Sequence, residues 1–305
     1  MQQDKHDHTN HHHHHEVSHM SGKKIFWVTV LNATITVAEF IGGLISGSLA
    51  LLSDSLHNLS DTLAIALSYV AHRISLRSKN RKKTFGYKRA EIIAAFVNGS
   101  VLFAISGMLI IEAFRRFTNP EPIDGILMMI IALIGLASNL FSVLLLHKDS
   151  KGNLNIKSSY LHLLNDTISS VGVVFGGIAI NVWGISWIDP IITLMIAIYI
   201  LRETFRIIKT SVDILMQSSP DVDYEQIQKD VEQIEEVVNL HHVHAWMINE
   251  QSIFFEAHVD MKDVRLCEAE QVIQKIEKIL KNKYGFTHTT LQAEVNKCDN
   301  KNLFV

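Results

Sequence analysis

Two segments of the chain repeat the same pair of metal-binding side chains at helical spacing. His57 and Asp61 stand four residues apart, and His162 and Asp166 repeat that spacing further along the chain. Positions i and i+4 of an α-helix share one face, so each pair presents an imidazole beside a carboxylate. Two such helices supply two nitrogen and two oxygen donors, a set that suits tetrahedral Zn²⁺ at about 2.0–2.2 Å. One pair alone is equally well explained as a polar contact between helices, but two matched pairs favour a metal site.

The elements that carry these pairs are too apolar for an ordinary soluble protein. Of the 305 residues, 48% are hydrophobic and 19% are charged, with a mean hydropathy of +0.17, whereas soluble domains carry about 25% charge. Long apolar stretches, each near the roughly 20 residues that cross a bilayer, occupy residues 25–46, 49–74, 91–116, 123–147, 158–183 and 187–213. We therefore predict a multi-pass α-helical membrane protein with six transmembrane helices.

Ionisable residues inside these stretches demand an explanation, because a charge at the bilayer centre costs roughly 2.5–3.5 kcal/mol on insertion scales. Both His/Asp pairs fall in this class, in the second and fifth stretches. Asp54 precedes His57 by about one turn, and we expect it to support the site or its access route more than to bind metal. Glu39 is expected to be a packing or cavity-lining polar group.

The loops between the apolar stretches differ in charge. The loops after the second and fourth stretches are rich in Lys and Arg, whereas the short loops at Gly47-Ser48 and Gly184–Ser186 contain none. Arg115 and Arg116 go against this bias. The positive-inside rule places the basic loops and both termini in the cytoplasm, and we expect a plasma-membrane protein. The net charge of −3 gives no sign of nucleic-acid binding, and two cysteines are too few for a disulfide framework.

The C-terminal region after Ser218 reads as a soluble α+β layer with the element order α-β-β-α-β. Strict strand alternation puts His242 and His244 on one face, His258 on a face with Glu256 and Asp260, and His288 with Glu294. These side chains could form one or two zinc sites, or the polar surface of an open sheet.

Histidines also crowd the N-terminus, where eight of the seventeen lie within the first twenty residues. The consecutive run His11, His12, His13, His14 and His15 is typical of a low-complexity metal-binding tail. An expression tag is the less favoured alternative, and a native tail could equally be an accessory with little effect. We assign no metal-binding role to His72, His147 or His241. The predicted domains are a His-rich disordered tail (1–22), a six-helix membrane domain (23–216), a cytoplasmic domain with candidate metal ligands (217–298) and a short tail (299–305).

At these residues the sequence resembles the cation diffusion facilitator family, specifically its bacterial zinc/cadmium/cobalt-resistance branch. The likeness extends over about residues 23–296. The motifs that carry it are Ser48–His57 with Asp61, Phe85–Glu91, Tyr160–His162 with Asp166, Val243–Trp246, Ala257–Val259 and Leu291–Glu294.

The resemblance implies a homodimeric, proton-coupled zinc exporter with six spans and a cytoplasmic ferredoxin-like domain. It implies a transport site made of His57, Asp61, His162 and Asp166. In the cytoplasmic domain it favours a zinc site at His244, His258 and Glu294, with His242, His288 and Cys298 as further candidate ligands. Zinc bound there would act as a regulatory ligand that favours the transport-competent dimer.

One departure from the family pattern and one match to it carry expectations of their own. Some bacterial members bind a second metal in the loop after span two, but the matching positions here are Lys83 and Tyr87, so we expect no site there. Arg89 and Asp213 occupy the places of a charge interlock between protomers. A solvated Arg89 near the lipid headgroups is the alternative.

Electrostatics suggests a transport mechanism independently of the family resemblance. Zn²⁺ with two aspartates is formally neutral, and two bare carboxylates left in a low-dielectric cavity favour protonation. Histidine exchanges metal for protons in the physiological range. We predict proton-coupled Zn²⁺ efflux by alternating access, with Cd²⁺ or Co²⁺ as further cargo, and no enzymatic activity. The expected partners are a second copy of the chain, the bilayer, Zn²⁺ and protons, and no nucleic acid.

Other classes remain open from the sequence. A transporter selective for another divalent metal, a passive channel and a metal-binding membrane receptor each fit part of the pattern. A membrane metalloenzyme would need an open zinc coordination position and a general base, for which the sequence offers no additional motif.

Overall fold

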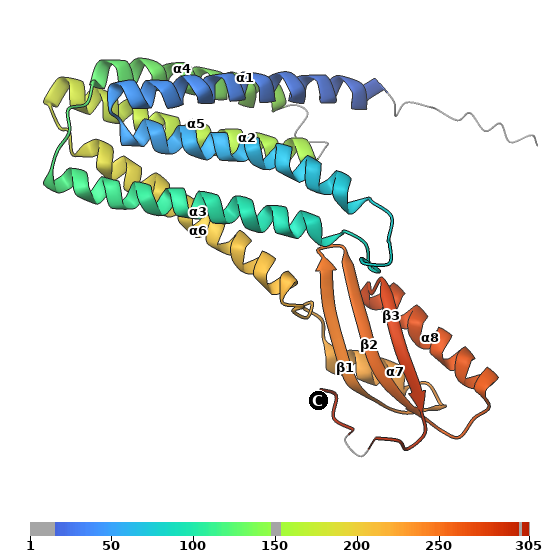
Figure 1. Cartoon of the computed structure of the whole chain (residues 1–305). Helices are drawn as coiled ribbons and strands as arrows, with labels where there is room; N and C mark the ends of the chain where they lie inside the picture. Colours follow the sequence, from blue (N-terminus) through green and yellow to red (C-terminus); the bar gives the residue numbers. More distant parts are fainter. Residues whose placement is uncertain (1–15, 148–153, 299–300, 305) are drawn as a thin grey trace, which may run out of the picture. The chain divides into compact units, whose positions relative to one another are not determined.

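The computed structural model describes residues 16–147, 154–298 and 301–304 (Figure 1). The predicted run His11–His15 therefore lies outside the described residues. Long helices come first: α1 (Glu16–Ser46), α2 (Leu49–Ser75), α3 (Arg89–Thr118), α4 (Gly125–Leu146), α5 (Leu154–Trp183) and α6 (Ile188–Leu215). They are followed by α7 (Tyr224–Glu232), β1 (Val237–Asn249), β2 (Ser252–Met261), α8 (Leu266–Tyr284) and β3 (His288–Glu294). The C-terminal order α-β-β-α-β is the one that the sequence pattern predicts.

Four helices in the described part of the chain are long and apolar enough to cross a membrane. These segments are Trp27–Ser46, Arg89–Thr118, Gly125–Leu146 and Tyr160–Trp183. Helix α2 falls short because it carries the polar residues of the candidate site, and α6 because it carries several charged residues along its length. Length and composition thus support four membrane helices, and the six-span topology remains a prediction.

The described chain forms two compact units. The first lies within Met1–Ile65 and Val101–Thr204, and the second within Ala66–Ser100 and Phe205–Val305. In the first unit α4 packs against both α1 and α5. A shared apolar core joins α2, α4, α5 and α6 through Leu51, Met128, Val173 and Ile192. This core holds α2 and α5, the two helices of the His/Asp pairs, in one packed unit.

The N-terminus of α2 is capped by an aspartate from another helix. Asp189 of α6 is fully buried and accepts hydrogen bonds from Ser48 Oγ at 2.6 Å, from the Leu49 amide at 2.9 Å and from the Ala50 amide at 3.2 Å. Free amides at a helix start are costly where water cannot reach them. The cap therefore fixes the beginning of the helix that carries His57.

The second unit contains a three-stranded sheet in the order β1-β2-β3. Strands β1 and β2 are antiparallel, whereas β2 and β3 are parallel and are joined through α8. Helices α7 and α8 cover one face (Figure 1), where Ile227, Val272 and Ile276 pack on Phe255 and Val259. The other face is free of these helices and carries the polar side chains of β2.

A β-bulge interrupts the alternation of β1. His241 pairs with His258, and His244 pairs with Glu256. The paired positions are three residues apart on β1 but only two apart on β2, so β1 contains one extra residue here. His242, within this segment, has a left-handed φ of 54°. Cross-strand partners share a face, so the bulge brings His241 onto the same face as His244. Strict alternation, which would separate His241 from that face, is therefore wrong at this point.

Helices α4 and α5 approach closely at a glycine, and this approach can be tested. A Cβ at Gly177 would lie 2.9 Å from Met129 Cβ and 3.1 Å from the Gly125 carbonyl oxygen. We expect Gly177→Ala to lower the free energy of unfolding, because overpacking typically costs about 1–3 kcal/mol. The midpoint of thermal unfolding of the detergent-purified protein measures this effect.

The matched control is Gly172→Ala on the same helix, where an added Cβ meets nothing within 4 Å. Its unfolding midpoint should stay at or above that of the wild type, because alanine costs less backbone entropy than glycine in a helix. Equal midpoints for the two variants would contradict the close approach.

Candidate metal sites

The His/Asp pairs of α2 and α5 meet in the first unit. Asp61 Oδ2 lies 3.5 Å from His57 Nε2 and 3.3 Å from His162 Nε2, and His162 Nε2 lies 3.5 Å from Asp166 Oδ2. Donor atoms of His57, His162 and Asp166 lie within 4.8 Å of one another. We call these four residues the membrane cluster.

These spacings match what a tetrahedral zinc ion requires of its ligands. Two ligands at about 2.0–2.2 Å from the ion lie roughly 3.3–3.6 Å apart, and the three distances of the membrane cluster fall at 3.3–3.5 Å. Asp166 is buried, and its Oδ2 has no hydrogen-bond partner in the described structure. An unsatisfied buried carboxylate oxygen is unfavourable unless a cation or a proton compensates it.

Two more carboxyl groups lie close to the membrane cluster. Asp54 is 3% exposed and accepts a hydrogen bond of 2.6 Å from Ser169 Oγ of α5. Glu39 of α1 is 2% exposed and is near enough to Asp54 and Asp166 to interact electrostatically with both. A Cβ at Gly135 would lie only 1.8 Å from Glu39 Oε1, so the glycine of α4 makes room for this carboxyl group.

Glu39 lies near this site, although its sequence context predicted only a packing or cavity-lining polar group. Its position in the sequence could have indicated a functional role, because an ionisable side chain within an apolar membrane span is usually functional. What the sequence did not contain was the packing of α1 on α4, which brings Glu39 toward the membrane cluster.

A second group of donors lies on the helix-free face of the sheet. Glu294 Oε1 is 3.0 Å from His241 Nε2, and Glu294 Oε2 is 3.3 Å from His258 Nδ1. Cys298 Sγ lies 3.6 Å from both His258 Nδ1 and Glu294 Oε2. We call these four residues the sheet cluster; their donor atoms lie within 4.8 Å of one another.

The sheet cluster also fits a tetrahedral ion. Zinc binds thiolate sulfur at about 2.3 Å and imidazole or carboxylate at about 2.0–2.2 Å, and distances of 3.0–3.6 Å between the donors are compatible with that geometry. His241 is fully buried, and neither of its ring nitrogens has a hydrogen-bond partner in the described structure. A bound cation would satisfy one of these nitrogens.

An ion pair stands next to the sheet cluster. Burial disfavours the charged form of Asp260, but the Lys301 ammonium at 2.6 Å and the Asn296 amide at 2.9 Å outweigh it and hold the pKa of this carboxyl below its usual range. Asp260 therefore stays ionised at neutral pH, and the Lys301 ammonium balances its charge.

The structure brings some of the predicted ligands of this domain together and leaves the others outside the sheet cluster. It brings His258, Glu294 and Cys298 together with His241, to which the sequence analysis gave no role. His242 stacks on His258 with ring centroids 4.6 Å apart, and its ring lies 5.2 Å from that of His244. His288 contacts Phe254, with ring centroids 4.7 Å apart. None of these last three histidines belongs to a donor cluster within the described residues.

Comparison with known proteins identifies the family. Residues 25–216 match the cation efflux transmembrane domain, and residues 219–296 match the cytoplasmic domain of cation efflux proteins, a domain whose family name denotes dimerisation. The chain belongs to the cation efflux family of membrane transporters, which are not enzymes.

Individual relatives are similar over most of their length. The chain is 36% identical over 287 residues to the cadmium, cobalt and zinc/H⁺-K⁺ antiporter of Bacillus subtilis, covering 92% of each chain. It is 36% identical to the zinc transporter ZitB of Pectobacterium atrosepticum, covering 92% of this chain and 87% of the relative. It is 34% identical to the metal cation efflux system protein CzcD of Cupriavidus metallidurans, covering 88% and 85%. Recognition of the family from its motifs is thus confirmed, together with metal cation efflux as the function.

The sheet cluster can be tested against the alternative ligand His244. Within the described residues, the hydrophobic core of the cytoplasmic domain is formed between Val222 and Leu303, so a fragment of residues 218–305 contains that core. We expect His241→Ala to weaken zinc binding to this fragment at least tenfold, since loss of even an outer-shell partner typically costs 10–100-fold. Calorimetric titration with ZnCl₂ measures the change.

His244→Ala is the matched control, because it removes an imidazole from the same strand but from outside the sheet cluster. It should leave the zinc affinity within a few-fold of the wild type. The opposite result, with His244 essential and His241 dispensable, would show that the ligand set is the one implied by family resemblance.

Proposed function

We propose that this protein exports cytosolic Zn²⁺ across the plasma membrane in exchange for protons, as a homodimer with both termini in the cytoplasm. The observation that carries the proposal is the membrane cluster on helices of a cation efflux domain, in which His57, His162 and Asp166 form one donor group and Asp61 lies 3.3–3.5 Å from the two imidazoles. The rest of the transport domain provides the six spans and the alternating access that move the ion.

Zinc is the proposed cargo because of the donor set. Two nitrogen and two oxygen donors suit Zn²⁺ well, and imidazole ligands disfavour the hard cations Mg²⁺ and Ca²⁺. The relatives are named for zinc, cadmium and cobalt, and the latter two ions are proposed as further cargo. The alternative is that this transporter is selective for another divalent metal, which a comparison of uptake between metals would detect.

Protons are the proposed counter-ions because the site cannot remain empty and charged. Asp61 and Asp166 neutralise a divalent ion, and its departure leaves carboxylates in surroundings of low dielectric constant. Protons taken up from the outside compensate these charges and displace the metal outward. Binding to two conformations with different affinities then converts the proton gradient into net zinc movement.

The sheet cluster is proposed as a regulatory zinc site. Its ligands come from β1, β2, β3 and the segment after β3, so one ion would tie the whole sheet together and stabilise the folded domain by mass action. Because the matching domain family is named for dimerisation, we propose that zinc bound here favours the dimer. The Arg89–Asp213 interlock between protomers remains a hypothesis; within the described single chain the two side chains form no ion pair.

The proposed use of a proton gradient to drive zinc transport can be tested in proteoliposomes. Proteoliposomes with an acidic interior should accumulate ⁶⁵Zn²⁺ many-fold above vesicles at equal pH, because protons leaving the lumen drive zinc inward through correspondingly oriented transporters. A protonophore should abolish the difference. Accumulation that ignores the pH gradient would point to a passive channel, and dependence on a K⁺ gradient would point to potassium as a co-substrate.

The ligands of the membrane cluster can be tested by substitution. His57→Ala removes one of four donors and Asp166→Asn removes one of two negative charges, and we expect each to reduce gradient-driven zinc uptake at least tenfold. His72→Gln is the matched control on helix α2, because His72 pairs with Glu91 at 2.8 Å and lies outside the membrane cluster. Normal uptake by His57→Ala or Asp166→Asn would refute the site, and zinc binding without any flux in the wild type would identify a receptor.

A further inference from the structure

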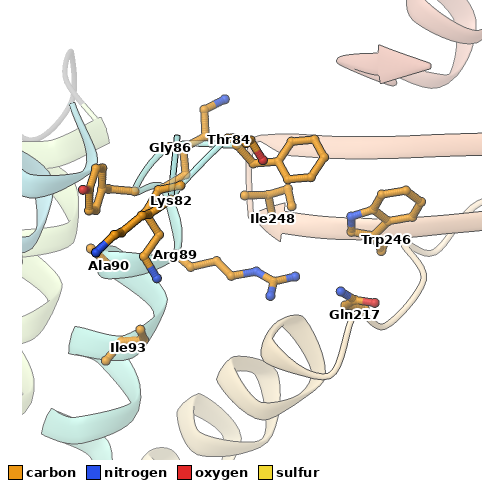
Figure 2. A pocket seen from close by; sticks show the side chains of 13 residues that line it. Lys82, Thr84, Gly86, Arg89, Ala90, Ile93, Gln217, Trp246 and Ile248 are labelled. Carbon is orange, nitrogen blue, oxygen red and sulfur yellow. The ribbon is translucent and has the colours of Figure 1, made fainter. Parts of the chain in front are cut away.

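The second unit contains a pocket that the transport proposal does not use. It is a cavity of about 460 Å³ formed by the loop between α2 and α3, the first turns of α3 and the neighbouring part of β1. Figure 2 shows Arg89 from the start of α3 directed into this space, with Gln217 and Trp246 on the opposite side. A volume of this size falls in the range that holds small-molecule ligands.

The charge of the pocket is entirely of one sign. Its lining includes Lys82, Lys83, Lys88 and Arg89 and no carboxylate. None of these four cations forms an ion pair in the described structure, and the buried Arg89 Nε has no hydrogen-bond partner. The N-terminus of a helix of 30 residues adds partial positive charge at the same place. Such a site recognises an anion, and a phosphate group in particular.

The remaining lining is apolar and continues along a membrane helix. Phe85 and Trp246 belong to the lining, and Ile93 lies at the edge of the pocket on α3. One helical turn further, Val97 stands on the same side of α3; Ile93 is 50% exposed and Val97 46%. Because Arg89–Thr118 is itself a candidate membrane span, this exposed apolar stripe runs from the pocket into the bilayer. A free phosphate would make no use of it, whereas a lipid acyl chain would.

We propose that this pocket binds the phosphodiester headgroup of an anionic phospholipid, whose acyl chain lies along Ile93 and Val97. The lipid phosphate pairs with Lys83 and Arg89, and the loop between α2 and α3 thereby becomes attached to the membrane surface. Basic pockets at the ends of membrane helices bind anionic headgroups by the same electrostatics. This inference goes beyond metal transport and does not depend on which metal is carried.

Native mass spectrometry of the detergent-purified full-length protein tests the proposal. The protein is mixed with equal amounts of phosphatidylglycerol and phosphatidylcholine, and the bound lipid is counted. Wild type should retain phosphatidylglycerol in preference, and Lys83→Gln combined with Arg89→Gln should weaken that retention at least tenfold. Equal retention of the two lipids, or unchanged retention by the double variant, would overturn the proposal.

The control variant combines Lys275→Gln and Lys278→Gln, which removes the same charge from exposed positions of α8 and should retain phosphatidylglycerol as the wild type does. Asp213→Asn should also have no effect, which separates lipid binding from the Arg89–Asp213 interlock. If the double variant unfolds, Lys83→Gln alone serves, because Lys83 is exposed, with an expected loss of a few-fold.

A soluble competitor separates the two sources of phosphate. Millimolar sn-glycerol 3-phosphate carries the headgroup chemistry without an acyl chain and should fail to displace bound phosphatidylglycerol. Displacement at that concentration would assign the pocket to a small soluble anion and would overturn the lipid assignment.

Discussion

Charge compensation inside an apolar helix bundle is the requirement that organises the transport domain. Carboxyl groups of α2 and α5 meet two imidazoles at distances of 3.3–3.5 Å, and one of these carboxyl groups, that of Asp166, is buried. Such a group of donors is unfavourable unless a cation or protons accompany it. The surrounding features hold it in place: Asp189 caps the helix that carries His57, and glycines allow α4 to pack closely on its neighbours.

The membrane cluster could be predicted from sequence because its geometry is local. The spacing of His57 from Asp61, and of His162 from Asp166, is converted to a shared face by the helix itself, whatever the tertiary fold. Only the meeting of the two helices had to be inferred, and the pairing of matched motifs was enough for that. Glu39 was different, because its approach to the site depends on how α1 packs against α4.

The sheet cluster shows why the same reasoning was less successful in the cytoplasmic domain. The element order and the contributions of His258, Glu294 and Cys298 were predicted, but His241 was assigned no role. Strand alternation is a two-residue rule, and one extra residue reverses every assignment beyond it. The bulge at His242, with its φ of 54°, is such an insertion, and nothing in the run of adjacent histidines indicates where it falls.

The number of buried carboxyl groups argues for protons as the counter-ions. Asp61 and Asp166 suffice to neutralise one divalent cation, yet Asp54 and Glu39 are buried beside them, at 3% and 2% exposure. Asp54 has a hydroxyl donor in Ser169, while Glu39 Oε1 has no hydrogen-bond partner in the described structure. A metal ion alone would leave this excess of acidic groups uncompensated in either conformation. In the proposed exchange, protons would compensate these groups one at a time and keep the net charge of the bundle small whether or not the metal is bound. An exchange of Zn²⁺ for K⁺ alone would provide no such adjustment, because a monovalent ion cannot satisfy several separated carboxyl groups at once.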